Sequence, residues 1–482
     1  MRSARLRAIS GGRLETEAGM AVSIQSHPTG PRRPAPRPRR VLEWALFGGL
    51  SVALLLWPAV CNRFPIVFYD TGGYIAAPHI DPLQPGRGVA YGLFLTVFQG
   101  GTDWWPAIAA QAVACVWLIH LVARVHRLPS GPRALVLTVG LLAAATSLPF
   151  FTAQLMPDWL GAALVLVLYL LAFQAERLAR WERFGLAALG AFGIAVHMSH
   201  VALAVGLLPV IAAAAGMHRA HIRLPALMVA MGIALVPLTN AVPTGRPALT
   251  PGGETFVFGR LVQDGIVARF LADHCPSSDL QLCAYKDVLP ATADEWIWAG
   301  SSPFHAVGGW EGGADEMRRI TIASLEAYPL EHLARAGASG WSQFWSFRTG
   351  DGLADNEYWH AAYVIETFYP EALAGFAAAR QQADGPGFAA INAFHAPVIF
   401  ASLALMVPAL LWAPLRRERE LRELCAFVLL ALLGNAVICG ILSNPHDRYQ
   451  SRLVWLAFFC TILAARHLVH RARSRAWQSA LT

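Results

Sequence analysis

Apolar stretches close to 20 residues long recur along this 482-residue chain, from Val41 almost to the C-terminus. A helix needs roughly 20 such residues to cross the hydrocarbon core of a bilayer. Charged residues make up only 14% of the chain, compared with about 25% in soluble domains. The sequence therefore predicts an all-α polytopic membrane protein.

The hydropathy pattern predicts about ten transmembrane helices. They form an N-terminal module at 41–242, which includes an outer loop at 61–103, and a C-terminal module at 396–470. The connection at 243–395, between spans seven and eight, is the size of a domain and is predicted to be a mostly helical extracytoplasmic domain. The expected spans are 41–60, 104–124, 134–152, 157–174, 184–197, 201–217, 224–242, 396–414, 424–442 and 453–469.

Basic residues indicate the orientation. Arginine is concentrated in short connections at 124–133, 174–183, 218–223 and 416–423. Because cytoplasmic loops carry an excess of Lys and Arg, both termini are predicted to be cytoplasmic, with a disordered basic tail at 1–40 and a short tail at 471–482. Translation can also start at Met20. The net charge of +7 follows from this topology, so nucleic acid is not an expected partner. The predicted location is the bacterial inner (plasma) membrane.

The segment SNPHDRYQSR at 443–452 has three charged side chains, a histidine and a tyrosine between two long apolar runs. Charges beside a hydrocarbon layer are costly, so this segment is a candidate functional site. Arg448 and Arg452 are one helical turn apart, a spacing that suits binding of phosphate oxygens. The alternative is a plain charged hairpin. The candidate residues for binding substrate or lipid phosphate are His446, Asp447, Arg448, Tyr449 and Arg452.

The first outer loop contains a second polar segment, FYDTGGY. Asp70 and Tyr74 are four residues apart and share a face if a helix begins here. Asp70 is a candidate general base or metal ligand, and the alternative is a helix N-cap. Arg87, in a Pro/Gly turn, is a candidate phosphate ligand, although its side chain can also simply reach the membrane surface.

Two further polar positions lie at predicted span ends. Asp158, in MPDWL, is a candidate site carboxylate, but an acid also suits the first turn of a helix for structural reasons. His197 and His200 bracket the turn between spans five and six and can bind phosphate, transfer protons or bind a metal. Their alternative role is that of hydrogen-bonded polar turn residues.

The predicted extracytoplasmic domain contains two cysteines in HCPSSDLQLC. In an oxidising compartment Cys275 and Cys283 are predicted to form a disulfide. Zinc, with His274 as a further ligand, is the competing interpretation. No cofactor is certain, and a divalent cation is an option. The tryptophans of this domain can stack on sugars, anchor it at the membrane surface or pack in its core.

The acid in FYDTGGY, followed by an interfacial loop and a second acid in MPDWL, resembles the GT-C superfamily over Val41 to about Val242. These integral membrane glycosyltransferases use polyprenyl-phosphate-linked sugars. The resemblance implies that Asp70 activates an acceptor hydroxyl and that Asp158 lies near the acceptor or a metal. The basic and histidine residues would then hold the lipid phosphate. Arg87 matches the family's Arg-Pro-x-Gly-Tyr run only loosely, since this chain has Pro-Gly-Arg-Gly-Val-Ala-Tyr.

The resulting hypothesis is a glycosyltransferase that moves a sugar from a polyprenyl-phosphate donor to a glycan, lipid or protein acceptor at the extracytoplasmic face of the bilayer. One alternative is a lipid-linked glycan transporter or flippase, for which ionisable groups near mid-membrane and repeated halves are expected. The middles of the predicted spans hold almost no charge, which favours chemistry at the surface. A non-catalytic membrane assembly protein is the other alternative.

Overall fold

The computed structural model describes residues 38–217, 220–276, 279–353, 358–383, 387–411 and 418–479. The predicted tail at 1–40 lies almost entirely outside these residues. The chain divides into two units, Met1–Leu42 and Glu43–Thr482. Of the first unit only the helical residues 38–42 are described.

The described residues form helices and loops without a β-strand, and one isolated β-bridge joins Ile66 to Gln154. Among them, seven helices are long and apolar enough to cross a membrane. The all-α, multi-pass class predicted from the sequence is therefore confirmed, while the count of ten spans stays a prediction. These helices are α1 (Pro38–Asn62), α4 (Trp105–Val125), α9 (Met198–Gly216), α10 (Arg223–Thr244), α20 (Phe388–Leu411), α22 (Arg419–Leu442) and α23 (Asp447–Ser479).

Shorter helices occupy the other predicted spans. The expected span at 134–152 is divided into α5 (Pro132–Ala145) and α6 (Leu148–Thr152), because Thr146 is extended and its hydroxyl accepts a hydrogen bond from the Leu148 N–H. A threonine hydroxyl that bonds the local backbone competes with continuation of a helix. The remaining two are α7 (Trp159–Phe173) and α8 (Arg180–Ala195), and α23 continues beyond the expected end of its span, to Ser479.

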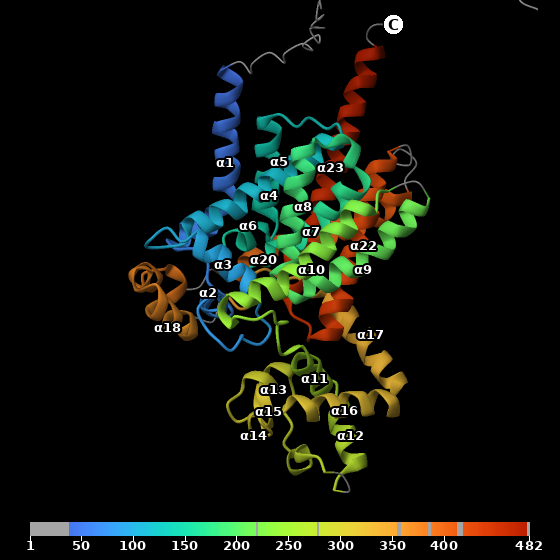
Figure 1. Ribbon diagram of the computed structural model, residues 1–482. Helices are drawn as coiled ribbons and strands as arrows, with labels where there is room; N and C mark the ends of the chain where they lie inside the picture. The colour runs from blue at the N-terminus through green and yellow to red at the C-terminus, as the bar shows by residue number, and fades with distance from the viewer. Residues whose placement is uncertain are drawn as a thin grey trace, which may run out of the picture. The chain divides into compact units, whose positions relative to one another are not determined.

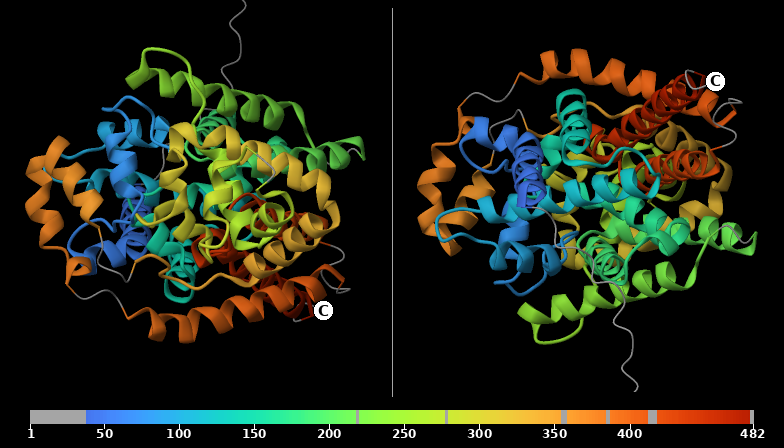
Figure 2. Two further views of the ribbon diagram at one scale, coloured as in Figure 1. Left: turned by 90° about the horizontal axis from the view of Figure 1, so that it is seen from below. Right: turned by 90° about the horizontal axis from the view of Figure 1, so that it is seen from above.

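Helix α7 is the centre of the bundle. Its residues Trp159 to Ala172 are all buried, and it packs against α4, α8, α9 and α23. A sequence of Leu, Val and Ala with no polar side suits a helix that is surrounded by other helices. In both views of Figure 2 the green helices of residues near 200–245 and the long orange helix α20 lie at opposite edges of the bundle.

The predicted domain at 243–395 is helical but has two different environments. Its first part, here called the distal helices (α11–α16), has its own core around Phe258, Trp296 and Met317. Figure 1 shows these helices at the end of the bundle opposite to the C-terminus. The distal helices are α11 (Gly253–Gln263), α12 (Ile266–His274), α13 (Ala293–Trp298), α14 (Pro303–Ala306), α15 (Gly309–Gly312) and α16 (Ala314–Ala327).

The second part packs back onto the bundle. Helix α17 (Pro329–Trp345) lies along α22, and α18 (Trp359–Phe368) lies against α2 (Thr71–Ala76). The short helix α19 (Leu373–Ala377) places Phe376 in the core of the bundle, and α3 (Val89–Val97) follows α2 in the first outer loop. These helices therefore surround the end of the bundle at which α23 begins (Figure 1).

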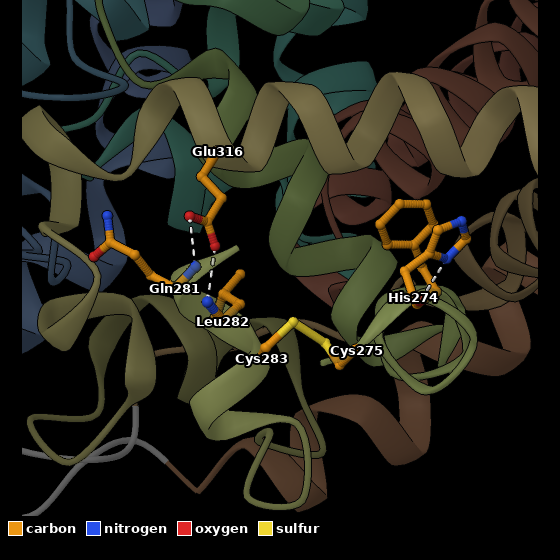
Figure 3. Close-up of a disulfide and its surroundings, with 7 residues drawn as sticks. His274, Cys275, Gln281, Leu282, Cys283 and Glu316 are labelled. Carbon is orange, nitrogen blue, oxygen red and sulfur yellow. Dashed lines mark hydrogen bonds between the residues drawn. A yellow bond between two sulfur atoms is a disulfide. The ribbon is translucent and has the colours of Figure 1, made fainter. Parts of the chain in front are cut away.

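The predicted disulfide between Cys275 and Cys283 is confirmed, and it closes a loop among the distal helices (Figure 3). Glu316 of α16 accepts hydrogen bonds from the backbone N–H groups of Gln281 and Leu282, which holds the same loop against the helix. The zinc alternative is wrong, because the two sulfur atoms are bonded to each other. His274 instead stacks on Phe270.

Candidate functional site

Five charged side chains from four separate segments meet where α23 begins, and they are called here the charge cluster. Arg87 forms an ion pair with Asp70, and the other carboxylate oxygen of Asp70 lies 3.2 Å from Nη1 of Arg448. Nε of Arg448 lies 3.9 Å from Oδ1 of Asp158, and Nη1 of Arg452 lies 3.2 Å from the same oxygen. Positive and negative groups thus alternate in one line.

The helices explain this order. Arg448 and Arg452 are one turn apart on α23 and share a face, so Asp158 reaches both. Asp70 and Asp158 are the N-cap residues of α2 and α7, but neither side chain makes a capping hydrogen bond. Helix capping therefore does not explain the presence of either carboxylate. Both side chains form ion pairs with arginine instead.

Burial distinguishes the members of the charge cluster. The side chains of Asp158 and Arg452 are completely buried, whereas that of Asp70 is 25% exposed. Burial by itself would raise the pKa of Asp70, but the neighbouring guanidinium groups of Arg87 and Arg448 outweigh it and hold the pKa below its usual value. Asp70 is therefore an ionised carboxylate in contact with the solvent-accessible side of the cluster.

Aromatic rings hold the guanidinium groups in place. The guanidinium carbon of Arg448 lies 4.1 Å from the centre of the Phe68 ring and 5.2 Å from that of Tyr449, and Arg452 lies 5.5 Å from Tyr449. Such cation–π contacts are strongest where water is excluded. The cluster consists of three arginines and two carboxylates, so the guanidinium groups outnumber the acids with which they pair.

Of the two predicted histidines, His197 connects to the cluster through Ser199, and the centre of the His200 ring lies 5.1 Å from that of the His197 ring. The Ser199 hydroxyl accepts a hydrogen bond from Arg452 at 2.9 Å and contacts Nδ1 of His197 at 2.8 Å. His200 is fully buried, with Nδ1 2.8 Å from the carbonyl of Gly193, and its Nε2 has no hydrogen-bond partner among the described residues. The alternative role, that of hydrogen-bonded polar turn residues, therefore fits His197. It fits only one of the two ring nitrogens of His200.

Tyr74 is also placed near the charge cluster. It follows Asp70 by one turn of α2, it is buried, and its ring packs edge-on against that of Tyr91. Burial, followed by the charge of Asp70, raises the pKa of Tyr74, so its hydroxyl stays protonated.

A second ionic group lies next to the charge cluster and includes two residues that the sequence did not single out. Nε2 of His446 is 3.2 Å from Oδ2 of Asp294 on α13, and Nδ1 is 3.6 Å from Oδ2 of Asp351. Asp351 also accepts a hydrogen bond from the backbone N–H of Arg448, and Asp447 accepts one from that of Arg348. The start of α23 is therefore attached to the 348–351 loop by several bonds.

Glycines flank Asp351 for a steric reason. Gly350 and Gly352 have positive φ values of 99° and 70°. A Cβ at these positions would lie 2.2 Å from the rings of Phe388 and Phe68, respectively. Only glycine fits such a backbone beside an aromatic ring. The Gly-Asp-Gly run was the available sequence signal for Asp351, whereas no pattern marked Asp294.

His446 makes the stability of this region dependent on pH. Burial alone would lower its pKa, but hydrogen bonds to Asp294 and Asp351 raise it to about 10. The ion pairs therefore contribute fully below the unfolded value of about 6.5, and the contribution is lost as the pH rises through about 10. We expect the thermal unfolding midpoint of the wild type to fall across this interval and that of His446→Gln to change less. His221→Gln, at an exposed histidine, is the control, and equal slopes in all three proteins would contradict the prediction.

The carboxylates of the site have basic side chains as partners. Among the described residues, no three His, Cys, Asp or Glu side chains are grouped as a metal site. Asp70 and Asp158 have arginine partners instead, and Asp294 and Asp351 share a histidine.

Comparisons with family models, with curated proteins and with solved structures found no match to this chain.

Proposed function

We propose that this protein is a membrane glycosyltransferase of the GT-C type, which moves a sugar from a polyprenyl-phosphate donor to a glycan, lipid or protein acceptor at the extracytoplasmic side of the bacterial inner membrane. The proposal includes ten spans with both termini in the cytoplasm. The observation that carries it is the charge cluster, in which the two acids of the resemblance and three arginines lie together at the ends of apolar helices.

The arginines suit the leaving group of such a reaction. When the bond from the sugar to the phosphate oxygen breaks, the bonding electrons stay with the phosphate, which gains negative charge. Fixed cations in a site that excludes water stabilise this charge in the transition state. Arg448 is the central cation of the cluster, and Arg87 pairs with the same carboxylate, Asp70.

Asp70 is the proposed general base. The acceptor hydroxyl attacks the anomeric carbon and gives its proton to the Asp70 carboxylate. In the structure the two guanidinium groups hold the pKa of Asp70 low, which makes it a weak base. A phosphate that draws Arg448 or Arg87 toward itself would raise the basicity of Asp70, so we propose that the donor binds before the acceptor.

Asp158 has a positioning role in this proposal. Its side chain is completely buried and pairs with Arg452, so it does not reach a substrate in this conformation. It orients the two arginines of α23 instead. Arg448 and Asp351 border a void of about 10 Å³, enough for one water molecule. This void is too small for a sugar phosphate, so we propose that a donor bound between Arg448 and Asp351 moves α23 away from the loop that holds Asp351.

Replacement of Asp70 tests the function. We expect Asp70→Asn to lower the transfer of sugar from a polyprenyl-phosphate donor by about 10²-fold or more, because the amide cannot accept the proton. Transfer of a radiolabelled sugar to membrane acceptors is the measurement, with thermal unfolding as the check on folding. Asp287→Asn, at an exposed position among the distal helices, is the matched control. Unchanged transfer in folded Asp70→Asn would remove Asp70 from this role.

A further inference from the structure

A cavity of about 390 Å³ lies beside the charge cluster but does not include any member of it. It is lined by the last turns of α1, by α6, by the segment that ends in Gln381, and by Phe388 at the start of α20. This volume is in the range of sites that bind small molecules. The proposed function assigns no role to it.

The walls of the cavity are mostly apolar. Polar side chains at its edge are already bonded within the protein: the Asn62 amide oxygen accepts from the Gln381 backbone N–H, and the Gln381 side chain donates to Val67 and Tyr358. They offer little to a polar ligand. The apolar lining residues are Trp57, Pro58, Ile66, Phe150, Leu353 and Phe388.

Arg380 is the charged side chain of the lining. It is exposed, and no carboxylate among the described residues pairs with it. This contrasts with the charge cluster, where each guanidinium group has a carboxylate partner. An unpaired cation at the edge of an apolar cavity suits a ligand that has an anionic group at one end and an apolar chain behind it.

The place of the cavity in the fold indicates where such a ligand would come from. Trp57 and Cys61 belong to the last two turns of α1, and Phe388 begins α20, so the cavity lies at the ends of two candidate spans. Trp57 is 37% exposed on the apolar surface of α1. The ends of spans are the level of lipid head groups, where tryptophan is common. The cavity therefore lies at the level expected for the lipids of one leaflet.

We propose that this cavity binds an anionic lipid, with its apolar chain against Phe150, Leu353 and Phe388 and its anionic group on Arg380. Phe150 and Leu353 also border the small void beside Arg448, so they separate this lipid from the charge cluster. Bilayer phospholipids and polyprenyl phosphates share the required chemistry. The proposal does not depend on glycosyl transfer.

Cys61 provides a direct measurement. It lines the cavity and is exposed, whereas the other free cysteines among the described residues are buried. We expect a neutral maleimide to alkylate Cys61 of the full chain rapidly in nanodiscs of phosphatidylcholine. Addition of phosphatidylglycerol or of undecaprenyl phosphate should slow alkylation by about fivefold or more, since occupancy protects in proportion to 1 + [L]/Kd.

Variants distinguish a specific site from a general effect of membrane charge. Arg380→Gln should remove the protection, and Arg246→Gln, at another exposed arginine, should keep it. Protection by phosphatidylglycerol identifies a bilayer lipid as the occupant, and protection by undecaprenyl phosphate alone identifies the carrier. Equal alkylation rates in all nanodiscs, or the same protection in Arg380→Gln, would overturn the proposal. Sugar transfer can be present or absent in either case, so the two proposals fail separately.

Discussion

Replacement of Arg452 by methionine is expected to lower the free energy of unfolding by about 3–5 kcal/mol. The Arg452 side chain is completely buried and lies 3.2 Å from the equally buried Asp158. Its removal leaves a carboxylate inside the bundle with Arg448, at 3.9 Å, as the nearest remaining cation. The hydrogen bonds that Arg452 donates to Ser199 and Asn435 are lost as well. Reversible unfolding in mixed micelles measures the change.

A variant with both residues replaced distinguishes the effect of the unpaired charge from that of the lost packing. Asp158→Asn removes the uncompensated charge. The protein with both Arg452→Met and Asp158→Asn should therefore be more stable than Arg452→Met alone. This result would appear as a favourable interaction energy in the double-mutant cycle. Arg419→Met, at a largely exposed ion pair with Glu423, should cost about 1 kcal/mol or less. Equal losses for Arg452→Met and Arg419→Met would show that the buried pair contributes no more than a surface pair.

Gly440→Ala is expected to destabilise the protein by about 1–3 kcal/mol, the usual range for overpacking. Helices α17 and α22 approach closely here, and a Cβ on Gly440 would lie 2.7 Å from the carbonyl oxygen of Ser339. This contact is with backbone, so the two helices must move apart. Since Gln343 on α17 bonds the backbone N–H and C=O of His446, the displacement should also reach the start of α23.

Gly434 on the same helix is the matched control. A Cβ there would have Leu203 at 3.8 Å as its nearest neighbour, an ordinary contact. Alanine in a helix is more favourable than glycine by about 0.5–1 kcal/mol, so Gly434→Ala should stabilise α22 slightly. Opposite signs for the two substitutions, measured by the same unfolding experiment, support the close approach. A neutral Gly440→Ala variant would contradict it.

The helical class followed directly from the sequence, because runs of apolar residues and a shortage of charge leave few other folds. The break in the helix at Thr146 was not predictable from hydropathy, since it involves a hydrogen bond from the Leu148 N–H to the Thr146 hydroxyl. Nor did the pattern show that α17 and α18 leave the distal part of the chain and pack on the bundle. Their amphipathic faces are compatible with either location, and only tertiary contacts decide between them.

The charge cluster was predictable as a set of residues but not as an arrangement. A common side of the membrane was the reason to group Asp70, Asp158 and Arg448, and the structure brings them within ion-pair distance. Their chemical roles stay predictions. Sequence reasoning missed Asp294, on the short helix α13, and Asp351, in a Gly-Asp-Gly loop, because their partner His446 lies far along the chain.

The length of α7 has a consequence for the depth of Asp158 in a bilayer. Its 15 residues span about 22 Å, which is less than the roughly 30 Å of a hydrocarbon layer. Its far end is followed by Arg177, which pairs with Glu420 beside the short connection at the opposite side of the bundle. If α7 crosses the bilayer as the proposed topology requires, we expect Asp158 to lie below the level of the lipid head groups on its side. Bilayer thickness should therefore influence how easily a reactant reaches Asp158.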